Sequence, residues 1–313
     1  MPEVSVIIPT FDCGAYIGEA IESVLKQTYQ DFEIIIVDDG STDNTRELVS
    51  SFHDERLQYR YQENRGASDA RNTGIKASRG KYISFLDADD VWLPLKLELQ
   101  VKALESSPRI GLVYSDMYYF GLNKTLPQKT FFQCFHWNPP RGRVLNLLAE
   151  RYFAHLSVVM IKRDVINQVG LFDTSLRNCQ DYDFLFRVAL YYEFEVIPQP
   201  LAKYRFSERQ ISRDTESVIT CHIAFFKKAL NMPLLDFRMR SKFYSRLSQA
   251  HFNYGKFCFK RQRYAKAGRE LLAASFIFTK QWNILILAYL KQITGKIWLR
   301  LKFNNKVSRA DQI

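Results

Sequence analysis

The first 115 residues alternate between two patterns of apolar positions. Short apolar runs bounded by turn residues are typical of buried strands, and apolar residues three and four apart are typical of helices. Residues 15–27 and 67–77 show the helical spacing. The runs that predict strands are residues 4–8, 32–37, 57–61 and 82–86. Because strands separated by helices favour right-handed crossovers, we predict an α/β fold with a mostly parallel sheet.

The rest of the chain follows a different pattern. Residues 157–161 predict another strand, and residues 163–169 and 181–192 predict helices. From about residue 215 the pattern is helical and basic. The change in composition near residue 212 predicts one domain over residues 1–212 and a basic helical appendage over residues 213–313.

Composition narrows the class of protein. Hydrophobic residues make up 47% of the 313 positions, which indicates a buried core and excludes disorder. The five cysteines are scattered and none forms a C-x-x-C pair, so neither a disulfide framework nor a zinc site is predicted. No secretory signal is recognisable at the start. We therefore expect a cytoplasmic location.

Charge is distributed unevenly along the chain. Residues 201–313 contain 23 Lys and Arg but 6 Asp and Glu, whereas the rest of the chain carries a net charge of −6. This basic region favours an anionic partner, for which we expect a membrane surface and no nucleic acid. Residues 282–301 predict a basic amphipathic helix flanked by Trp282 and Trp298, suited to a membrane interface. The alternative is packing on the preceding helices or on a second subunit, in a homo-oligomer.

Three carboxylates follow the fourth predicted strand. Asp87, Asp89 and Asp90 lie within four residues of one another. Like charges so close repel, and burying them is unfavourable unless a cation or a hydrogen-bond donor compensates. A hard cation such as Mg²⁺ or Mn²⁺ prefers carboxylate oxygen. A solvated acidic turn has the same pattern, so the motif alone leaves both interpretations open.

The neighbouring strand ends strengthen the prediction of a site. Thr10 and Asp12 follow the first strand, Asp38 and Asp39 follow the second, and Asp87 follows the fourth. In a parallel sheet, ligands bind beyond the carboxyl ends of the strands. We therefore expect these polar side chains to meet at one edge.

Taken together, these segments resemble glycosyltransferase family 2 in their order and spacing. Residues 37–43 have the sequence Val-Asp-Asp-Gly-Ser-Thr-Asp, and residues 85–90 have the sequence Phe-Leu-Asp-Ala-Asp-Asp. The resemblance extends over residues 3–212 and leaves residues 213–313 uncovered. The other segments that carry it are residues 4–10, 23–28, 65–74, 169–173, 180–185 and 201–212.

The resemblance implies a GT-A fold, with a Rossmann-like sheet that binds a nucleotide. The donor half would span about 1–115 and the acceptor half 116–212. The implied reaction moves a sugar, with inversion, from a nucleoside diphosphate sugar to a hydroxyl, with UDP favoured and Mg²⁺ or Mn²⁺ required. A glycan or lipid-linked acceptor implies polysaccharide or glycolipid synthesis, with peripheral contact at the inner face of the cytoplasmic membrane as one option.

The same resemblance assigns roles to residues. Asp89 would ligate the metal, and Asp87 would face both ribose and metal beside Ala88. Asp181 would be the general base, although an aspartate that opens a helix is also a common N-cap. The residues expected around the nucleotide are Pro9, Thr10, Asp12, Asp39 and Arg71.

Two positions depart from the family pattern. Gln180 precedes Asp181 where the family usually has Glu, which removes a negative charge beside the expected base. Ser207 stands where the family often has a histidine near the metal or diphosphate. Both departures put the strength of catalysis in question more than the fold.

Three other functions remain to be compared with sugar transfer. A non-catalytic sugar-nucleotide scaffold is the main alternative, because Gln180 and Ser207 leave it open. A sugar nucleotidyltransferase is less favoured, since residues 9–12 are not a glycine-rich phosphate loop. A dinucleotide oxidoreductase lacks support, because no G-x-G-x-x-G follows the first strand.

Overall fold

The computed structural model describes residues 1–121, 130–134, 136, 138–150, 152–206 and 214–281. The chain forms two compact units, Met1–Asp214 and Thr215–Ile313. The boundary that the sequence predicts near residue 212 lies outside the described residues. Each unit is described by itself.

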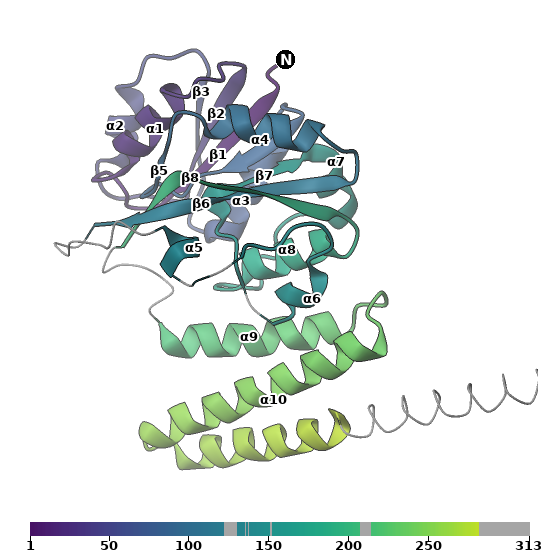
Figure 1. The fold of residues 1–313 in the computed structure, drawn as a ribbon. Helices are drawn as coiled ribbons and strands as arrows, with labels where there is room; N and C mark the ends of the chain where they lie inside the picture. Colours follow the sequence, from purple (N-terminus) through teal and green to yellow (C-terminus); the bar gives the residue numbers. More distant parts are fainter. Residues whose placement is uncertain (122–129, 135, 137, 151, 207–213, 282–313) are drawn as a thin grey trace, which may run out of the picture. The chain divides into compact units, whose positions relative to one another are not determined.

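The described residues of the first unit build one sheet of eight strands (Figure 1). The strand order is β3-β2-β1-β4-β7-β6-β8-β5. Four neighbouring pairs, β1–β2, β1–β4, β2–β3 and β6–β8, are parallel, and the pairs of β7 and β5 with their neighbours are antiparallel. The strands are β1 (Val4–Thr10), β2 (Phe32–Asp38), β3 (Leu57–Tyr61), β4 (Tyr82–Phe85), β5 (Val91–Trp92), β6 (Ile110–Phe120), β7 (Val159–Lys162) and β8 (Glu193–Arg205).

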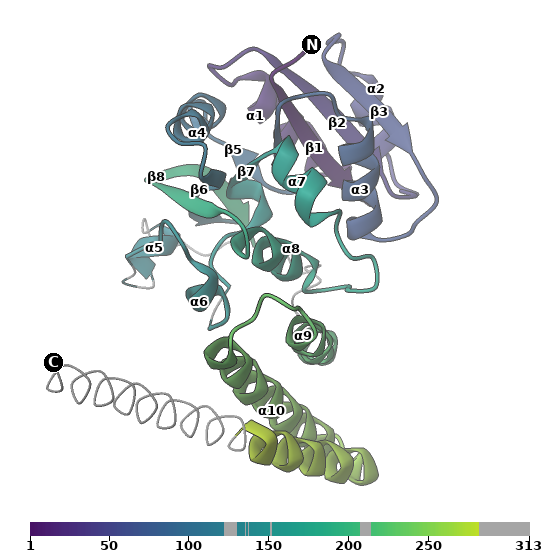
Figure 2. The same ribbon diagram turned by 90° about the vertical axis from the view of Figure 1, so that its right-hand side faces the viewer.

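Helices cover both faces of this sheet. Every residue of β1 and β2 is buried, as expected for parallel strands with helices on both sides. The helices α1 (Ile17–Leu25) and α4 (Lys96–Glu105) lie against one face, and α3 (Ala67–Ala77) lies against the other (Figure 2). The core of the unit is therefore the sheet itself.

The predicted α/β fold with a mostly parallel sheet is confirmed. Each of the four predicted strands is present and starts where predicted; β1 ends two residues later, β2 one residue later and β4 one residue earlier than predicted. The strand predicted at 157–161 differs at its start, because η1 (Leu156–Val158) forms a 3₁₀ turn before β7. The Ser157 hydroxyl of this turn bonds both the Asp90 carboxylate and the Asp87 amide, in the segment after β4.

Shorter helices complete the first unit. They are α2 (Thr45–Ser50), α5 (Phe131–Cys134), α6 (Leu145–Leu148), α7 (Arg163–Val169) and α8 (Gln180–Ala189). The last of these begins one residue before the predicted start at residue 181, ends three residues before the predicted end, and buries its apolar side, including Phe184 and Leu185. It thereby fixes the position of Asp181 in its first turn.

The second unit is helical over its described part. It contains α9 (Thr215–Leu230), α10 (Phe237–Lys260) and a further helix that is described from residue 264 to residue 281. Asp236 caps α10 by accepting a hydrogen bond from the Met239 amide (2.8 Å). Glu216 of α9 accepts two hydrogen bonds from the Arg263 guanidinium, both 2.9 Å. This fork-shaped pair ties the start of α9 to the turn after α10.

Among the described helices, none combines the length and the apolar character that crossing a membrane requires. The amphipathic helix predicted at residues 282–301 lies outside the described residues.

Candidate active site

The ends of β1 and β2 meet as the parallel register requires. Thr10 lies opposite Asp38, and the Asp39 amide donates to the Thr10 carbonyl (2.9 Å). The Asp38 carboxylate accepts hydrogen bonds from the Ser41 amide (2.8 Å) and the Tyr59 hydroxyl (2.6 Å). Asp38 is therefore satisfied by the protein and holds the loop after β2 in place.

The segment after β1 is shaped by Asp12. Its backbone is left-handed (φ 48°), a conformation that aspartate adopts more readily than most residues. The Asp12 carboxylate accepts from the Thr42 amide (2.7 Å), so it links the loops that follow β1 and β2. The Thr10 hydroxyl is buried and has no hydrogen-bond partner among the described residues. Pro9, inside β1, is buried and pairs in register with Val37.

Most hydrogen-bond acceptor positions of Asp39 are used within the protein. Its side chain is buried, and its carboxylate accepts from the Gln62 amide group (2.7 Å), the Arg65 backbone amide (2.9 Å) and the Gly66 amide (2.7 Å). A carboxylate offers about four acceptor positions, so about one remains for a ligand. Asp39 thus fixes the turn that leads into α3, and any contact with a nucleotide base is limited to one hydrogen bond.

Two glycines allow α3 to approach the sheet. Gly66, which donates to Asp39, has φ 93° and precedes the first turn of the helix. Gly74 lies against β1 so closely that an added Cβ atom would be 2.4 Å from Cγ2 of Ile7. This close approach brings Arg71, one turn earlier, to the end of β4.

Arg71 is buried but only partly paired. Its Nη2 donates to Asp87 Oδ1 (2.6 Å), while Nε and Nη1 are buried without a partner among the described residues. The guanidinium also lies 5.8 Å from the ring centroid of Phe172. Because a guanidinium has five N–H donors, this arrangement leaves donors available for an anionic ligand.

Asp87 and Asp89 form the electronegative part of the site. The Asp87 side chain is 37% exposed and forms an ion pair with Arg71. No side chain among those described donates a hydrogen bond to Asp89, and burial, followed by the charge of Asp87, raises the pKa of Asp89 to about 6. Ala88 between them is buried. A cation close to Asp89 would therefore favour its ionised form.

Asp90 has a structural role. It is buried, accepts from the Ser157 hydroxyl (2.6 Å) and from the Arg205 amide (2.9 Å), and so joins η1 to the end of β8. The Ser157 hydroxyl also accepts from the Asp87 amide (3.1 Å), which fixes the backbone of the carboxylate segment. Burial raises the pKa of Asp90 well above its usual range.

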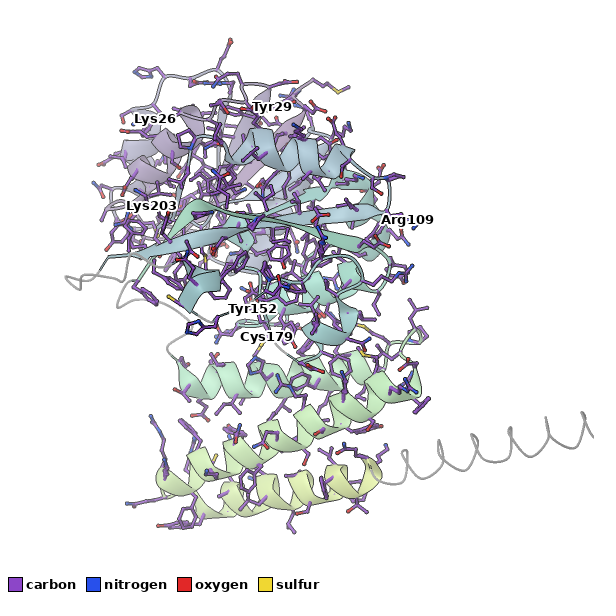
Figure 3. The ribbon with its side chains drawn as sticks, viewed as in Figure 1. Lys26, Tyr29, Arg109, Tyr152, Cys179 and Lys203 are labelled. Atoms are coloured by element: carbon purple, nitrogen blue, oxygen red, sulfur yellow. The ribbon has the colours of Figure 1, made fainter. Side chains whose placement is uncertain are left out.

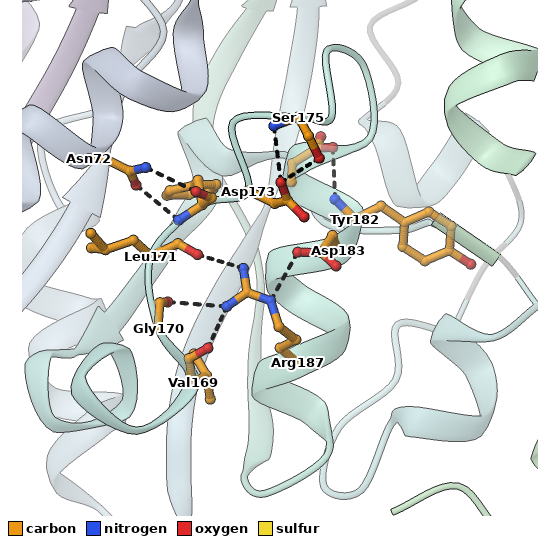
Figure 4. A network of polar contacts seen from close by, with 11 residues as sticks. Asn72, Val169, Gly170, Leu171, Asp173, Ser175, Tyr182, Asp183 and Arg187 are labelled. Atoms are coloured by element: carbon orange, nitrogen blue, oxygen red, sulfur yellow. Dashed lines mark hydrogen bonds and ion pairs between the residues drawn. The ribbon is translucent and has the colours of Figure 1, made fainter. Parts of the chain in front are cut away.

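A network of polar contacts ties α8 to α3 (Figure 4). Asn72 of α3 exchanges two hydrogen bonds, both 2.9 Å, with the backbone of Phe172. The Phe172 ring stacks on Phe184 of α8 with centroids 4.2 Å apart. Since Arg71 is the neighbour of Asn72, the helix that carries Asp181 and the helix that carries Arg71 are held by the same loop.

The two carboxylates at the start of α8 have different surroundings. Asp183 is fully buried and pairs with Nε of Arg187 (2.9 Å), whose other nitrogens donate to backbone carbonyls of residues 169–171 (Figure 4). Asp181 is half-buried, and its Oδ1 accepts from the Tyr182 amide (2.7 Å). Asp183 thus holds the helix, and Asp181 is the carboxylate open to the site. An N-cap role for Asp181 is wrong, because Cys179 occupies that position.

Two aromatic residues face Asp181 that the sequence did not reveal. Tyr152 and His155 are half-buried with ring centroids 5.5 Å apart, and Figure 3 marks Tyr152 together with Cys179, the residue before α8. Asp181 and Asp87 face both rings. Burial lowers the pKa of His155, so its imidazole is neutral near pH 7. No spacing or motif marks these two residues, because only folding brings them to α8.

Arg71, Asp87 and Asp181 all lie close enough to the Tyr152 hydroxyl to affect its pKa. Asp89 contributes, after burial, to the raised pKa of the Cys13 thiol in the segment that follows β1. Asp12 and Asp39 instead hold the surrounding loops. Ser207, the second departure from the family pattern, lies outside the described residues.

The donor atoms fit a hard divalent ion. Asp87 and Asp89 supply carboxylate oxygens, and burial together with the charge of Asp87 raises the pKa of Asp89, a shift that a bound cation would oppose as the Arg205 charge already does. Within the described part of the chain, no group of three or more His, Cys, Asp or Glu residues forms a complete ligand set. An ion held by one or two carboxylates takes its other ligands from phosphate and water, as Mg²⁺ usually does.

Comparison with known proteins supports this geometry. The family model described as glycosyl transferase family 2 matches residues 5–170, more than half of the chain. The chain belongs to glycosyltransferase family 2. An uncharacterized glycosyltransferase of Rickettsia prowazekii is 34% identical over 206 residues, which cover 63% of each chain. Glycosyltransferase GlyG of Streptococcus pneumoniae is 42% identical over 118 residues, 36% of this chain and 39% of that protein. Both relatives are thus matched over part of their length.

Solved structures show the same fold. Residues 1–349 of S. aureus TarS in complex with UDP-GlcNAc superpose with a TM-score of 0.64 at 20% identity, covering 90% of this chain and 81% of that one. Mannosyltransferase PcManGT from Pyrobaculum calidifontis, in complex with GDP-Man and Mn²⁺, superposes with a TM-score of 0.60 at 21% identity, covering 88% and 75%. The predicted GT-A fold of this family member is thereby confirmed.

Proposed function

We propose that this chain is an inverting glycosyltransferase. It transfers a sugar from a nucleoside diphosphate sugar to a hydroxyl of a glycan or lipid-linked acceptor in the synthesis of a polysaccharide or glycolipid. Asp181 acts as the general base, and Asp87 and Asp89 hold Mg²⁺ or Mn²⁺. The donor half and the acceptor half correspond to residues of about 1–115 and 116–212.

The observation that carries this proposal is a set of buried polar atoms without partners at the end of β1, in α3 and at the start of α8. They are the Thr10 hydroxyl, Nε and Nη1 of Arg71 and Oε1 of Gln180, each unpartnered within the described residues. Buried polar groups in folded proteins are nearly always hydrogen-bonded. Such a concentration therefore favours a polar ligand that completes the bonds, and a sugar diphosphate offers many oxygens.

The residues are suited to the two charges that change in sugar transfer. The acceptor hydroxyl loses its proton to the Asp181 carboxylate as its oxygen bonds to the anomeric carbon, and the bond from that carbon to the diphosphate breaks. The free donors of Arg71 stabilise the negative charge of the departing diphosphate. A divalent ion held by Asp87 and Asp89 would neutralise part of the same charge.

The donor is proposed to be a UDP-sugar. TarS was solved with UDP-GlcNAc and PcManGT with GDP-Man, so the fold accommodates either nucleotide. The single remaining acceptor position of Asp39 suits a base that presents one imide N–H, as uracil does.

The direct test is a screen of UDP-, GDP- and dTDP-sugars with and without Mn²⁺. A ligand that binds only the folded state raises the melting temperature by mass action. We expect a UDP-sugar with Mn²⁺ to raise it most and to be hydrolysed slowly. As a control, Glu22→Gln, which removes an exposed carboxylate of α1, should show the same rise in melting temperature as the parent protein. No stabilisation and no hydrolysis with any donor would contradict the proposal, and stabilisation without any transfer or hydrolysis would favour the scaffold alternative.

We also propose that the second unit contacts an anionic membrane surface peripherally, where a lipid-linked acceptor is available. Exposed apolar side chains on its described helices, Phe259 (61% exposed), Leu272 (72%) and Phe276 (74%), lie in a sequence rich in Lys and Arg. Aromatic and basic residues together suit a membrane interface. Sedimentation with anionic and neutral liposomes tests this, and equal binding to both would contradict it.

A further inference from the structure

The Tyr152 hydroxyl is one of several buried polar groups of the first unit that lack a hydrogen bond of normal geometry. The oxygen is buried and has no hydrogen-bond partner within the described residues. The ring itself is half-buried, 5.9 Å from the centroid of Tyr182 and 5.5 Å from that of His155. A phenylalanine would make the same ring contacts without leaving a buried hydroxyl unpaired. The hydroxyl therefore calls for an explanation other than packing.

The charged groups that face this hydroxyl come from three elements. Asp181 at the start of α8 acts most strongly, by its charge and as a hydrogen-bonding side chain, followed by Asp87 after β4 and Arg71 of α3. Burial and the Asp181 carboxylate raise the pKa of Tyr152, so the hydroxyl keeps its proton and can donate it. His155, the other titratable neighbour, is kept neutral by burial. Asp87 is already paired with Arg71, whereas Asp181 accepts one hydrogen bond, from the Tyr182 amide.

We propose that Tyr152 is a positioning residue for Asp181, whose carboxylate receives a hydrogen bond from the Tyr152 hydroxyl. This inference rests on the proposed role of Asp181 as general base. With the Tyr182 amide on one side and Tyr152 on another, the carboxylate is held in one orientation. Hydrogen bonds at catalytic groups are often long in the free enzyme and tighten when substrate binds.

The first measurement needs no substrate. Carboxyl-¹³C-labelled aspartate is incorporated into the full chain, and the Asp181 signal is assigned by its loss in Asp181→Asn. A hydrogen bond donated to the ionised form lowers the pKa of a carboxyl group, so Tyr152→Phe should raise the pKa of Asp181 by about half a unit or more. The matched control is Tyr182→Phe, which removes the buried hydroxyl that donates to the Leu148 carbonyl and leaves the Tyr152 hydroxyl in place.

A rise in Tyr152→Phe that is absent in Tyr182→Phe supports the proposal. A change below about 0.1 unit in a folded Tyr152→Phe protein overturns it, because a hydrogen bond to a charged group has a larger effect. If Tyr152→Phe does not fold, tyrosine labelled at ¹³Cζ serves instead. The Tyr152 signal, assigned with Tyr152→His, should then shift in Asp181→Asn, and an unmoved signal overturns the proposal equally.

The second measurement uses transfer. Tyr152→Phe should lower kcat by about 10-fold with an unchanged KM for the donor, and should move the acidic limb of the pH profile upward. Adding Tyr152→Phe to Asp181→Asn should have no further effect, because the two residues act as one unit. Additive losses overturn the proposal. Normal transfer by Asp181→Asn contradicts the proposed function instead, and the labelled aspartate still shows whether Tyr152 reaches Asp181.

Discussion

The two sides of the site use carboxylates in opposite ways. At the ends of β1 and β2, Asp38 and Asp39 are buried and accept several hydrogen bonds each from the surrounding loops. On the other side, Asp89 after β4 and Asp181 at the start of α8 have few protein partners, and Arg71, which pairs with Asp87, keeps unpaired donors. The hydrogen bonds of the first side are made within the protein, whereas those of the second side are proposed to be made by a ligand.

The difference explains why the same residue type carries different functions in one site. A carboxylate with most acceptor positions filled fixes backbone geometry and offers a ligand at most one hydrogen bond. A carboxylate with free positions and uncompensated charge is suited to a cation or a proton. Substitutions on the first side should therefore reduce stability, and substitutions on the second should reduce activity.

The largest effect is expected at Asp89. Asp89→Ala should nearly abolish turnover and metal-dependent donor binding, because it removes the carboxylate with the most uncompensated charge. Its melting temperature should stay close to that of the parent protein. Calorimetric titration of donor with and without Mn²⁺ measures the loss, and wild-type metal affinity in this variant would show that the metal assignment is wrong.

Asp183 should behave in the opposite way. Asp183→Ala leaves Arg187 without its buried partner, and such a loss costs about 3–5 kcal/mol of unfolding free energy. Asp181→Ala, two residues earlier, should cost far less because that side chain is half-buried. Urea unfolding of the two variants compares them directly, and equal losses would remove the distinction between the two carboxylates.

Asp39 tests the side of the site whose carboxylates are already hydrogen-bonded within the protein, at the ends of β1 and β2. Asp39→Ala removes the acceptor of three hydrogen bonds and leaves two partly buried donors, the Arg65 and Gly66 amides, without that acceptor, so we expect a loss of about 2–3 kcal/mol. Asp31→Ala, which removes an exposed carboxylate, is the matched control. Thermal unfolding decides between them. A stable Asp39→Ala protein that fails to bind any nucleotide would instead make Asp39 a ligand contact.

A smaller effect is expected from Lys96, the fully buried lysine of α4. Its Nζ donates to Ser84 Oγ (2.9 Å) and Gln100 Oε1 (2.6 Å), and burial lowers its pKa well below the usual value. Between the folded and the unfolded pKa, the unfolded chain binds more protons, so the stability contributed by Lys96 rises with pH. The stability of the parent protein relative to Lys96→Met should therefore increase as the pH approaches 10. A pH-independent difference would contradict a neutral buried lysine.

The sequence predicts the ends of β1 and β2 better than it predicts the surroundings of Asp181. Strands at 4–8 and 32–37 and the polar residues after them are local signals, and parallel pairing brings them together by a general rule. Tyr152 is different, because its neighbours Asp181 and Arg71 are distant in sequence and come from α8 and α3. Likewise, the pattern of residues 180–185 does not show that Asp183 forms an ion pair with Arg187.

The measurement that tests the account most directly compares Asp181→Asn with the parent protein in one assay of donor binding and sugar transfer. Because the amide keeps the shape of the side chain but cannot take a proton, donor and metal affinity should be unchanged while transfer falls by about 10²-fold or more. Near-normal transfer by Asp181→Asn would contradict the assignment of the open carboxylate as the base.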